Sequence, residues 1–288
     1  MDRITGRTTV YALLGSPVGH SGSPAMYNYC FEKLGIDSIY EAFDVNLDTL
    51  EAAMAGVKAL GLRGLNITMP CKSAVCAYMD ELSPAAELMG ACNTAVNENG
   101  HWHGHNTDGA GFVNNLKAHG VDVNGKKMVL FGAGGAGTAI AVQSALSGAK
   151  EITIFNIRDP FFERAEQTAK RIMERVPACK VNVCDLADEA ALKEKISACD
   201  ILANSTRAGM KPDDGDTPLK DSSLFRPGLV VADTVYNPRE TRFLREAAAA
   251  GCTAVTGIGM LIRQGEEAFR LFTGEQMPVD EVEEKFFS

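Results

Sequence analysis

The stretch that decides the fold is KMVLFGAGGAGTAIA, residues 127–141. Its first five residues predict a buried strand, and the residues after Gly137 predict a helix. A G-x-G-x-x-G motif between a strand and a helix is typical of the turn that holds the pyrophosphate of a dinucleotide. Gly132 permits the tight turn, Gly134 lets the pyrophosphate approach the backbone, and Gly137 lets the helix pack closely on the strand. We therefore expect phosphate contacts from Gly132, Ala133, Gly134, Gly135 and Ala136 at the helix N-terminus.

The next strand carries the residues that would choose between NAD and NADP. Residues 151–155 are mostly apolar and predict this strand, and Asn156, Arg158 and Asp159 follow it. A carboxylate about 20 residues after the glycines accepts a hydrogen bond from the 2′-hydroxyl of NAD, whereas the 2′-phosphate of NADP needs an arginine. Asp159 would repel that phosphate, so we expect NAD, with NADP as a second cofactor that Arg158 could bind. Either charge could instead be a solvated loop residue.

Strands and helices alternate along the rest of the chain as well, which is typical of an α/β fold. From residue 127 to 256 the alternation predicts a doubly wound, Rossmann-type NAD(P)-binding domain. Before it we expect strands at 10–15, 39–45 and 64–69, helices at 24–34 and 47–60, and a hairpin of strands 93–97 and 101–105 joined through Asn-Gly. The expected domains are a substrate-binding catalytic domain over 1–109, the NAD(P)-binding domain over 110–257, and C-terminal helices over 258–288 that return to the substrate domain.

Composition and charge narrow the class of protein. The 288 residues are 45% hydrophobic and 23% charged, as in ordinary globular enzymes, and the net charge of −9 argues against a nucleic-acid partner. No apolar run approaches the roughly 18 residues of a membrane helix, and the N-terminus does not resemble a signal peptide. The eight cysteines are scattered without a CxxC pair, so we expect reduced thiols. These features predict a cytoplasmic enzyme with a small-molecule substrate and no membrane partner, and a homodimer is one option for its assembly.

Four polar clusters lie before the nucleotide-binding domain. Ser21 and Ser23 precede an expected helix, where Ser23 is a favourable N-cap. Two hydroxyls at the start of a helix can also bind a carboxylate. Thr68 and Lys72 lie at the end of an expected strand. We expect Lys72 in the first turn of a helix, where a cation opposes the helix dipole and plain stability does not explain it. The remaining clusters are Asn93-Thr94 and Asn106-Thr107-Asp108, whose polar residues in short strand-like segments indicate a wet cleft rather than a core.

These motifs form a recognisable set. HSxSP, NxTxPxK, GAxNT and GxNTDxxG occur in this order before GAGGAG, and NSTRAGM, DTVYNP and GIGMLIRQ follow it. The set resembles the shikimate dehydrogenase family over nearly the whole chain. The stretches FNxRD and VYNP are most similar to the quinate/shikimate dehydrogenase branch of that family.

The resemblance implies an oxidoreductase that reversibly oxidises the C3 hydroxyl of shikimate, quinate or both, with hydride transfer to NAD(P). It implies that Lys72 and Asp108 assist proton transfer at this hydroxyl. The chemistry agrees, because a hydroxyl proton must leave as hydride moves to the nicotinamide, and a lysine held by a carboxylate can accept it. The implied substrate-binding residues are Ser21, Ser23, Tyr40, Thr68, Asn93 and Gln264, and the implied contacts along the cofactor towards its nicotinamide are Arg207, Val235 and Gly257.

Two residues depart from the family pattern, and two other functions stay open. Ile157 stands where many NADP-preferring members place arginine, and Tyr27 stands where a histidine is frequent. His101, His103 and His105 alternate along one strand and so face one side. Exposed histidines on a hairpin are commoner than a metal site and the family uses none, so we predict no metal. The alternatives are a folate or amino-acid dehydrogenase of similar architecture, and a non-catalytic quinate or shikimate sensor on the same scaffold.

Overall fold

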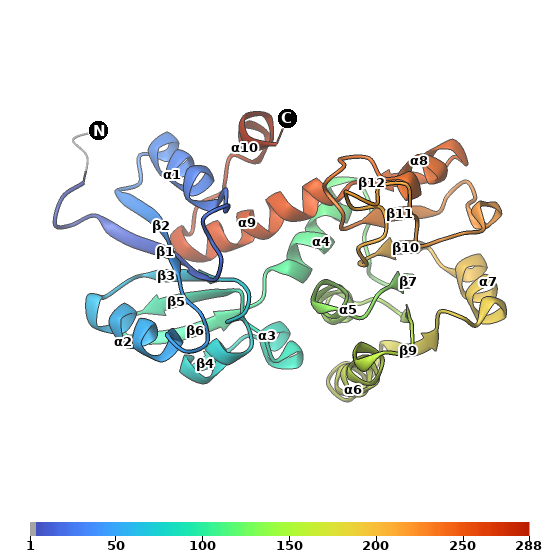
Figure 1. Cartoon of the computed structure of the whole chain (residues 1–288), viewed down its shortest axis with the longest axis horizontal. Helices are drawn as coiled ribbons and strands as arrows, with labels where there is room; N and C mark the ends of the chain where they lie inside the picture. Colours follow the sequence, from blue (N-terminus) through green and yellow to red (C-terminus); the bar gives the residue numbers. More distant parts are fainter. Residues whose placement is uncertain (1–3, 288) are drawn as a thin grey trace. The chain divides into compact units, whose positions relative to one another are not determined.

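The protein, described by a computed structural model over residues 4–287, contains two six-stranded sheets. Each sheet belongs to one of two compact units. The first unit is Met1–Thr107 with Gly265–Ser288, and the second is Asp108–Gln264. Strands and helices alternate in both units (Figure 1), so the predicted α/β fold class is confirmed.

The sheet of the first unit has the strand order β2-β1-β3-β5-β6-β4. Its strands are β1 (Thr9–Gly15), β2 (Ser38–Asp44), β3 (Gly64–Ile67), β4 (Glu81–Leu82), β5 (Thr94–Glu98) and β6 (His101–His105). Its helices are α1 (Ser23–Leu34), α2 (Leu50–Leu60), the 3₁₀ helix η1 (Ala74–Tyr78), α3 (Pro84–Met89) and α10 (Val279–Phe286). Strands β2 and β3 both pair in parallel with β1, one on each side. The chain therefore changes direction across the sheet at β1, and in α/β sheets ligands bind at the carboxyl ends of strands at such a point.

Both faces of this sheet are covered. On one face α2 presents Leu50, Met54 and Val57, whose spacing of four and three residues forms one apolar stripe, to a cluster that includes Trp102. The other face is aromatic. Its rings are Tyr11, Tyr27, Phe31, Phe269 and Phe272, which lie within 6.2 Å of one another in successive pairs. The last two rings come from helix α9 (Gly257–Thr273), which therefore contributes to the core of the first unit.

Strands β5 and β6 form the predicted hairpin. They pair in antiparallel register from Thr94 with His105 to Glu98 with His101. Asn99 and Gly100 connect them with φ angles of 56° and 93°. Two consecutive left-handed residues are what a type I′ turn requires, and Asn-Gly adopts this conformation most readily.

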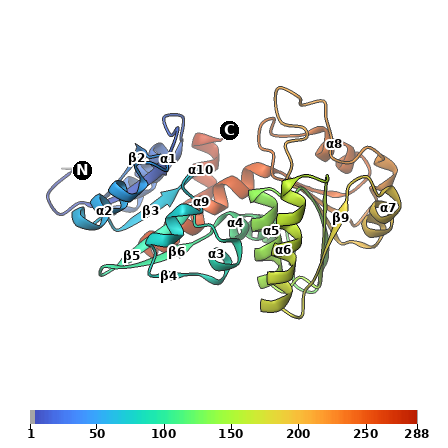
Figure 2. The ribbon, with the colours of Figure 1, turned by 60° about the horizontal axis from the view of Figure 1, so that its bottom comes forward.

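The second unit has an all-parallel sheet in the order β12-β11-β10-β7-β8-β9. Its strands are β7 (Lys127–Phe131), β8 (Glu151–Asn156), β9 (Lys180–Asp185), β10 (Ile201–Asn204), β11 (Val230–Asp233) and β12 (Thr253–Val255). Its helices are α4 (Asp108–Ala118), α5 (Gly135–Leu146), α6 (Pro160–Arg175), α7 (Glu189–Ala198), the 3₁₀ helix η2 (Ser222–Leu224) and α8 (Arg242–Ala249). Helices α5 and α6 lie side by side (Figure 2). This is the doubly wound order predicted for a dinucleotide-binding fold, with its switch point between β7 and β10.

Helix α9 is shared between the two units, which divide it after Gln264. We expected the boundary at residue 258, before most of this helix. Its first half belongs to the second unit because it packs closely on α4. A Cβ atom built on Gly111 of α4 would lie 2.6 Å from the backbone nitrogen of Gln264, and Asn115 donates a hydrogen bond of 2.9 Å to the carbonyl of Thr256.

Candidate active site

The loops after β1 and β3 leave the same edge of the first unit, because these strands are parallel neighbours. The backbone nitrogen of Thr68 donates to the carbonyl of Leu14 at 2.8 Å, and that of Ser16 donates to the carbonyl of Met69 at 2.9 Å. A Cβ atom on Gly15 would overlap the methyl group of Thr68, so only glycine allows this approach. The two predicted substrate loops are therefore held against each other.

Lys72 lies in the turn between β3 and η1 rather than in the first turn of a helix as predicted. The segment from Met69 to Ser73 forms turns instead, and η1 begins only at Ala74. The carbonyl of Lys72 accepts a hydrogen bond of 2.8 Å from the nitrogen of Cys92, and its side chain is half-buried. The backbone of Lys72 is thus tied to the segment that leads into β5.

The two serines lie at the start of α1, but Ser23 is not its N-cap. Gly22 holds the cap position without a side-chain hydrogen bond, and Ser23 is the first helical residue. The hydroxyl of Ser21 accepts the backbone N–H of Ser23 at 3.2 Å, which takes over part of the capping role. The first turn contains no acidic residue, so the positive end of the helix dipole is available to an anion.

The Asn-Thr clusters meet in one hydrogen-bond network at this edge. Asn66 donates to the hydroxyl of Thr94 at 3.0 Å across the β3–β5 pair. The side-chain oxygen of Asn93 accepts from the backbone nitrogen of Thr107 at 2.8 Å, and its amide donates to the hydroxyl of Thr107 at 3.1 Å. All four side chains are buried. The expectation of a wet cleft was wrong for these residues, because their polar groups bond to one another, as buried polar groups usually do.

Tyr40 extends this network into the interior. Its side chain is fully buried, and its hydroxyl donates to the side-chain oxygen of Asn66 at 2.8 Å. Burial raises the pKa of Tyr40 well above its usual value, so this hydroxyl stays protonated and remains a donor. The structure thus places Tyr40 behind Asn66, as a side chain that positions the network.

Asp108 and Gln264 lie in the second unit, on the helices that cross at Gly111. Asp108 is the first residue of α4 and is half-buried. It directly follows Thr107, which the hydrogen bonds to Asn93 hold in place. Gln264 is half-buried on α9, and its amide donates to the carbonyl of Leu261 at 3.1 Å.

The glycine-rich loop has the space that a pyrophosphate needs. Gly134 is the N-cap of α5, and a Cβ atom on Gly134 or Gly135 would meet no atom within 4 Å. A Cβ atom on Gly137 would instead overlap the carbonyl oxygen of Gly132, which itself has a φ of 96°. The glycines thus divide into two open positions, where a ligand can approach, and two that the tight turn and the helix packing require. This loop fits a dinucleotide.

The residues at the end of β8 and directly after it bond to one another and to neighbouring segments. Asn156 accepts from the backbone nitrogen of Ala133 at 3.1 Å and donates to Asp159 at 2.8 Å, so it holds the glycine loop. Asp159 is the N-cap of α6, where one of its oxygens accepts backbone hydrogen bonds. Arg158 is exposed and forms an ion pair of 3.0 Å with Asp185. Its guanidinium lies 4.2 Å from the ring centre of Phe162.

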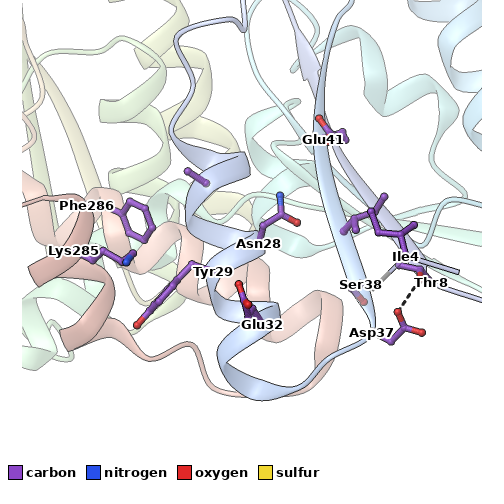
Figure 3. Close-up of a pocket in the computed structure, with 12 residues that line it drawn as sticks. Ile4, Thr8, Asn28, Tyr29, Glu32, Asp37, Ser38, Glu41, Lys285 and Phe286 are labelled. Carbon is purple, nitrogen blue, oxygen red and sulfur yellow. Dashed lines mark hydrogen bonds between the residues drawn. The ribbon is translucent and has the colours of Figure 1, made fainter. Parts of the chain in front are cut away.

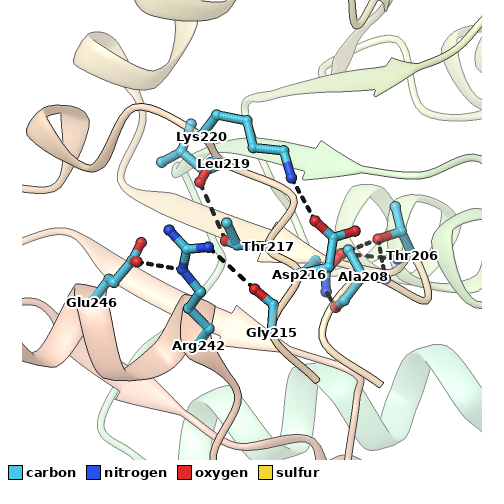
Figure 4. A network of polar contacts seen from close by, with 10 residues as sticks. Thr206, Ala208, Gly215, Asp216, Thr217, Leu219, Lys220, Arg242 and Glu246 are labelled. Atoms are coloured by element: carbon cyan, nitrogen blue, oxygen red, sulfur yellow. Dashed lines mark hydrogen bonds and ion pairs between the residues drawn. The ribbon is translucent and has the colours of Figure 1, made fainter. Parts of the chain in front are cut away.

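The loop after β10 contains a residue whose function the sequence analysis missed. The hydroxyl of Ser205 donates to the carbonyls of Phe131 and Gly132 at 2.7 and 3.1 Å, so it holds the start of the glycine loop in place. Ser205 directly follows β10, which pairs in parallel with β7. This position after a strand was the signal from which a contact with the glycine loop could have been predicted. The exposed Arg207 lies in the same loop, which polar contacts hold together (Figure 4). Val235 is buried, and a Cβ atom on Gly257 would overlap its carbonyl oxygen, so these two backbones are in contact.

Asp233, at the end of β11, ties this loop to the one that follows it. Its carboxylate accepts hydrogen bonds from Asn204 at 2.9 Å, Thr241 at 2.7 Å and the backbone nitrogen of Val235 at 2.9 Å. Burial raises the pKa of Asp233 to about 6, although these hydrogen bonds oppose the shift. The charged form of Asp233 is therefore less favourable in the folded protein than in the unfolded chain.

This raised pKa predicts that the contribution of Asp233 to folding stability decreases as pH rises from about 4 to about 6. In this interval the folded protein keeps the proton of Asp233 whereas the unfolded chain has released it, so rising pH favours unfolding. A shift of this size corresponds to roughly 3 kcal/mol. We expect Asp233→Asn to remove this decrease. Urea unfolding of both proteins at several pH values between 4 and 7 measures it, and parallel curves would contradict the assignment.

A separate cavity of about 520 Å³ lies elsewhere on the first unit (Figure 3). None of the predicted site residues lines it. Its walls carry three carboxylates, Glu32, Asp37 and Glu41, and one ammonium group, Lys285. This charge disfavours an anionic substrate, so the edge formed by the loops after β1 and β3 is the better candidate for a substrate site.

Comparison with known proteins decides the family. The profile of the shikimate dehydrogenase substrate binding domain matches residues 13–95, and that of the shikimate 5′-dehydrogenase C-terminal domain matches residues 257–285. A shikimate dehydrogenase (NADP(+)) of Listeria monocytogenes serotype 4b (strain F2365) is 46% identical over 286 residues, which cover 99% of this chain and 98% of that protein. The chain belongs to the shikimate dehydrogenase family. The recognition made from the motifs is confirmed, and the chain is an oxidoreductase of this family.

Two further members of the shikimate dehydrogenase family bear on substrate and cofactor. A quinate/shikimate dehydrogenase of Escherichia coli (strain SMS-3-5 / SECEC) is 46% identical over 281 residues, covering 98% of this chain and 97% of that protein. The crystal structure of shikimate 5-dehydrogenase from Listeria monocytogenes in complex with shikimate and NAD has a TM-score of 0.97 and 45% identity, covering 100% and 99% of the two chains. Within residues 4–287, no helix is long and apolar enough to cross a membrane.

Proposed function

We propose that this family member oxidises the C3 hydroxyl of shikimate, quinate or both, with NAD as its preferred cofactor and NADP as a second one. The observation that carries the proposal is the edge of the first unit, where the loops of Ser21, Thr68 and Lys72 meet the Asn93 network. Two relatives that match nearly the whole chain at 46% identity are named for shikimate or for both acids, and a similar protein was solved with shikimate and NAD.

Each predicted substrate residue has a chemical part in this proposal. Ser21 and Ser23 bind the substrate carboxylate with their hydroxyl groups, at the positive end of the α1 dipole. Thr68, Asn93 and Gln264 bind the ring hydroxyls, and Asn93 does so with the second hydrogen of its side-chain amide, since the first is donated to Thr107. Tyr40 does not touch the substrate in this account, because it is buried and fixes Asn66 through a hydrogen bond.

Lys72 and Asp108 contact the hydroxyl that reacts. The amine of Lys72 accepts the hydroxyl proton, and the carboxylate of Asp108 orients that hydroxyl by a hydrogen bond. Bound NAD(P) supplies the hydride acceptor. The proton and the hydride leave the same carbinol group, so the product is the 3-dehydro acid.

The second unit holds the cofactor in this proposal. The open glycines and the start of α5 bind the pyrophosphate, and Asp159 binds the 2′-hydroxyl of the adenosine ribose through the oxygen that faces away from the cap. Arg207, Val235 and Gly257 lie along the nicotinamide half. Asn156, the last residue of β8, holds the glycine turn in place by accepting a hydrogen bond from the backbone nitrogen of Ala133.

We also propose a cytoplasmic location and leave a homodimer as a prediction. NAD(P) is supplied inside cells. Every cysteine within the described residues is a free thiol, as is usual for proteins of a reducing compartment. Size-exclusion chromatography with light scattering would measure the oligomeric state.

The direct test of the proposed function is turnover with each acid and each cofactor. Purified protein is mixed with shikimate or quinate and with NAD or NADP at matched concentrations, and reduced cofactor is followed at about 340 nm. We expect NAD to support turnover of at least one acid. Binding of the acids without turnover in any combination would overturn the enzyme proposal in favour of a sensor.

Asp159→Asn tests the cofactor preference. Asparagine is as good an N-cap as aspartate, so α6 keeps its start while the negative charge is lost. We expect the ratio of kcat/KM for NADP to that for NAD to rise at least about tenfold, which corresponds to 1.4 kcal/mol. Asp221→Asn, at the cap of η2, is the matched control and should leave the ratio unchanged. An unchanged ratio in Asp159→Asn as well would remove Asp159 from the cofactor site.

A further inference from the structure

Two histidines and two carboxylates converge at the outer edge of the first unit, away from the residues assigned to substrate. His101 and His103 are two positions apart on β6, so both rings lie on the same face. Their ring centres are 4.7 Å apart. Trp102, between them in the sequence, points to the opposite face and is buried.

The neighbouring strands add a carboxylate on each side of these rings. Glu81 of β4 is directly opposite His103, and Glu98 of β5 is directly opposite His101. The side chain of His103 lies between them, with its Nδ1 atom 3.5 Å from Glu81 and its Nε2 atom 3.7 Å from Glu98. Three strands thus bring four metal-binding groups to one place.

We propose that Glu81, His101 and His103 bind a divalent transition metal of the Zn²⁺ and Ni²⁺ class, and that Glu98 holds the His103 ring from its other nitrogen. One ligand atom from each of the three residues lies within 4.8 Å of the others. Imidazole nitrogens with a carboxylate suit Zn²⁺, Cu²⁺ and Ni²⁺ better than Mg²⁺ or Ca²⁺. Ligands of a tetrahedral Zn²⁺ ion are about 3.3 Å apart, so the exposed Glu81 and His101 need only small rotations to close around an ion.

This proposal departs from the prediction of no metal made from the sequence. That prediction weighed the histidines without Glu81, because β4 has only two residues and its pairing with β6 is not visible in the sequence. Bound metal would link this edge strand to β6. It would therefore raise the midpoint of thermal unfolding by binding the folded state alone.

Titration of EDTA-treated protein with NiSO₄ tests the site. Trp102 is the single tryptophan of the chain, and paramagnetic Ni²⁺ bound beside it quenches its fluorescence. We expect saturable quenching with one ion per chain. We expect the dissociation constant to rise more than about tenfold in His103→Ala and in Glu81→Gln, because each loses a ligand and loss of even an outer partner costs that much. His119→Ala changes an exposed histidine of the second unit and serves as the control that should bind like the parent.

Two results would overturn the proposal. One is the absence of saturable quenching, which would leave His103 as an ion-pair partner of the two glutamates. The other is equal affinity in the parent, His103→Ala and Glu81→Gln, which would place the ion elsewhere, for example at a cysteine. Circular dichroism of each variant checks folding, and Glu81→Gln preserves the side-chain shape, so a folding defect in His103→Ala does not decide the outcome.

Discussion

Replacing Lys72 with alanine is expected to lower kcat by about 10²–10⁴-fold, which is the usual contribution of a positioned acid or base. The amine is the group that accepts the hydroxyl proton in our account. The serines, Thr68 and Asn93 still bind the acid in this variant, so we expect only a small change in the dissociation constant for shikimate. Steady-state kinetics together with calorimetric titration of shikimate separates the two quantities.

Two further variants make the Lys72 result specific. Lys72→Met keeps most of the side-chain stem and removes only the ammonium group, so it should lose activity to the same extent. Lys58→Ala removes an exposed lysine from the last turn of α2 and should keep the parental kcat. If Lys72→Met retained most of the turnover, proton transfer by Lys72 would be excluded.

Gly137→Ala is expected to lower both folding stability and NAD binding, whereas Gly134→Ala is expected to weaken NAD binding alone, although both residues belong to the glycine loop. The added methyl group of Gly137→Ala overlaps a backbone carbonyl, which cannot move as a flexible side chain can. We expect a loss of about 1–3 kcal/mol in the free energy of unfolding, as for other overpacked sites, and a large increase in KM for NAD. Gly134→Ala places its methyl group in open space, so it should leave stability nearly unchanged and still weaken NAD binding.

Urea unfolding and NAD titration of both variants measure the difference. Gly56→Ala is a suitable control, because Gly56 lies within α2 and a Cβ atom there meets no atom within 4 Å. It should be as stable as the parent or more stable, because alanine is the better helix former. Equal destabilisation by Gly134→Ala and Gly137→Ala would contradict the division of the loop into open and packed glycines.

The local sequence pattern predicts most of the fold because the hydrophobic residues recur with the clear periods of strands and helices. The strand, the glycines and the helix of residues 127–141 determine the doubly wound unit, and Asn99 with Gly100 determine the hairpin. The motifs before residue 109 also place Ser21, Thr68, Lys72 and Asn93 at one sheet edge, since they follow or precede neighbouring strands. These predictions depend on short segments that carry their own signal.

The errors come from pairings between distant segments. The Asn93–Thr107 hydrogen bonds turn an expected wet cleft into a buried network, and the Asn204–Asp233 bond joins two loops that the sequence keeps apart. Asp159 is different, because its role as N-cap was visible in its position before Pro160. A carboxylate that follows a strand can cap the next helix and also bind the ribose of a cofactor. The sequence motif alone does not tell the capping role from the ribose-binding role.

Turnover of shikimate carrying deuterium at C3 tests the central claim most directly. The deuterium should appear in the reduced nicotinamide, where mass spectrometry of the isolated NADH detects one additional mass unit. The rate of the chemical step should also fall for the labelled substrate. Reduced cofactor without deuterium would contradict hydride transfer from C3, and with it the roles proposed for Lys72 and Asp108.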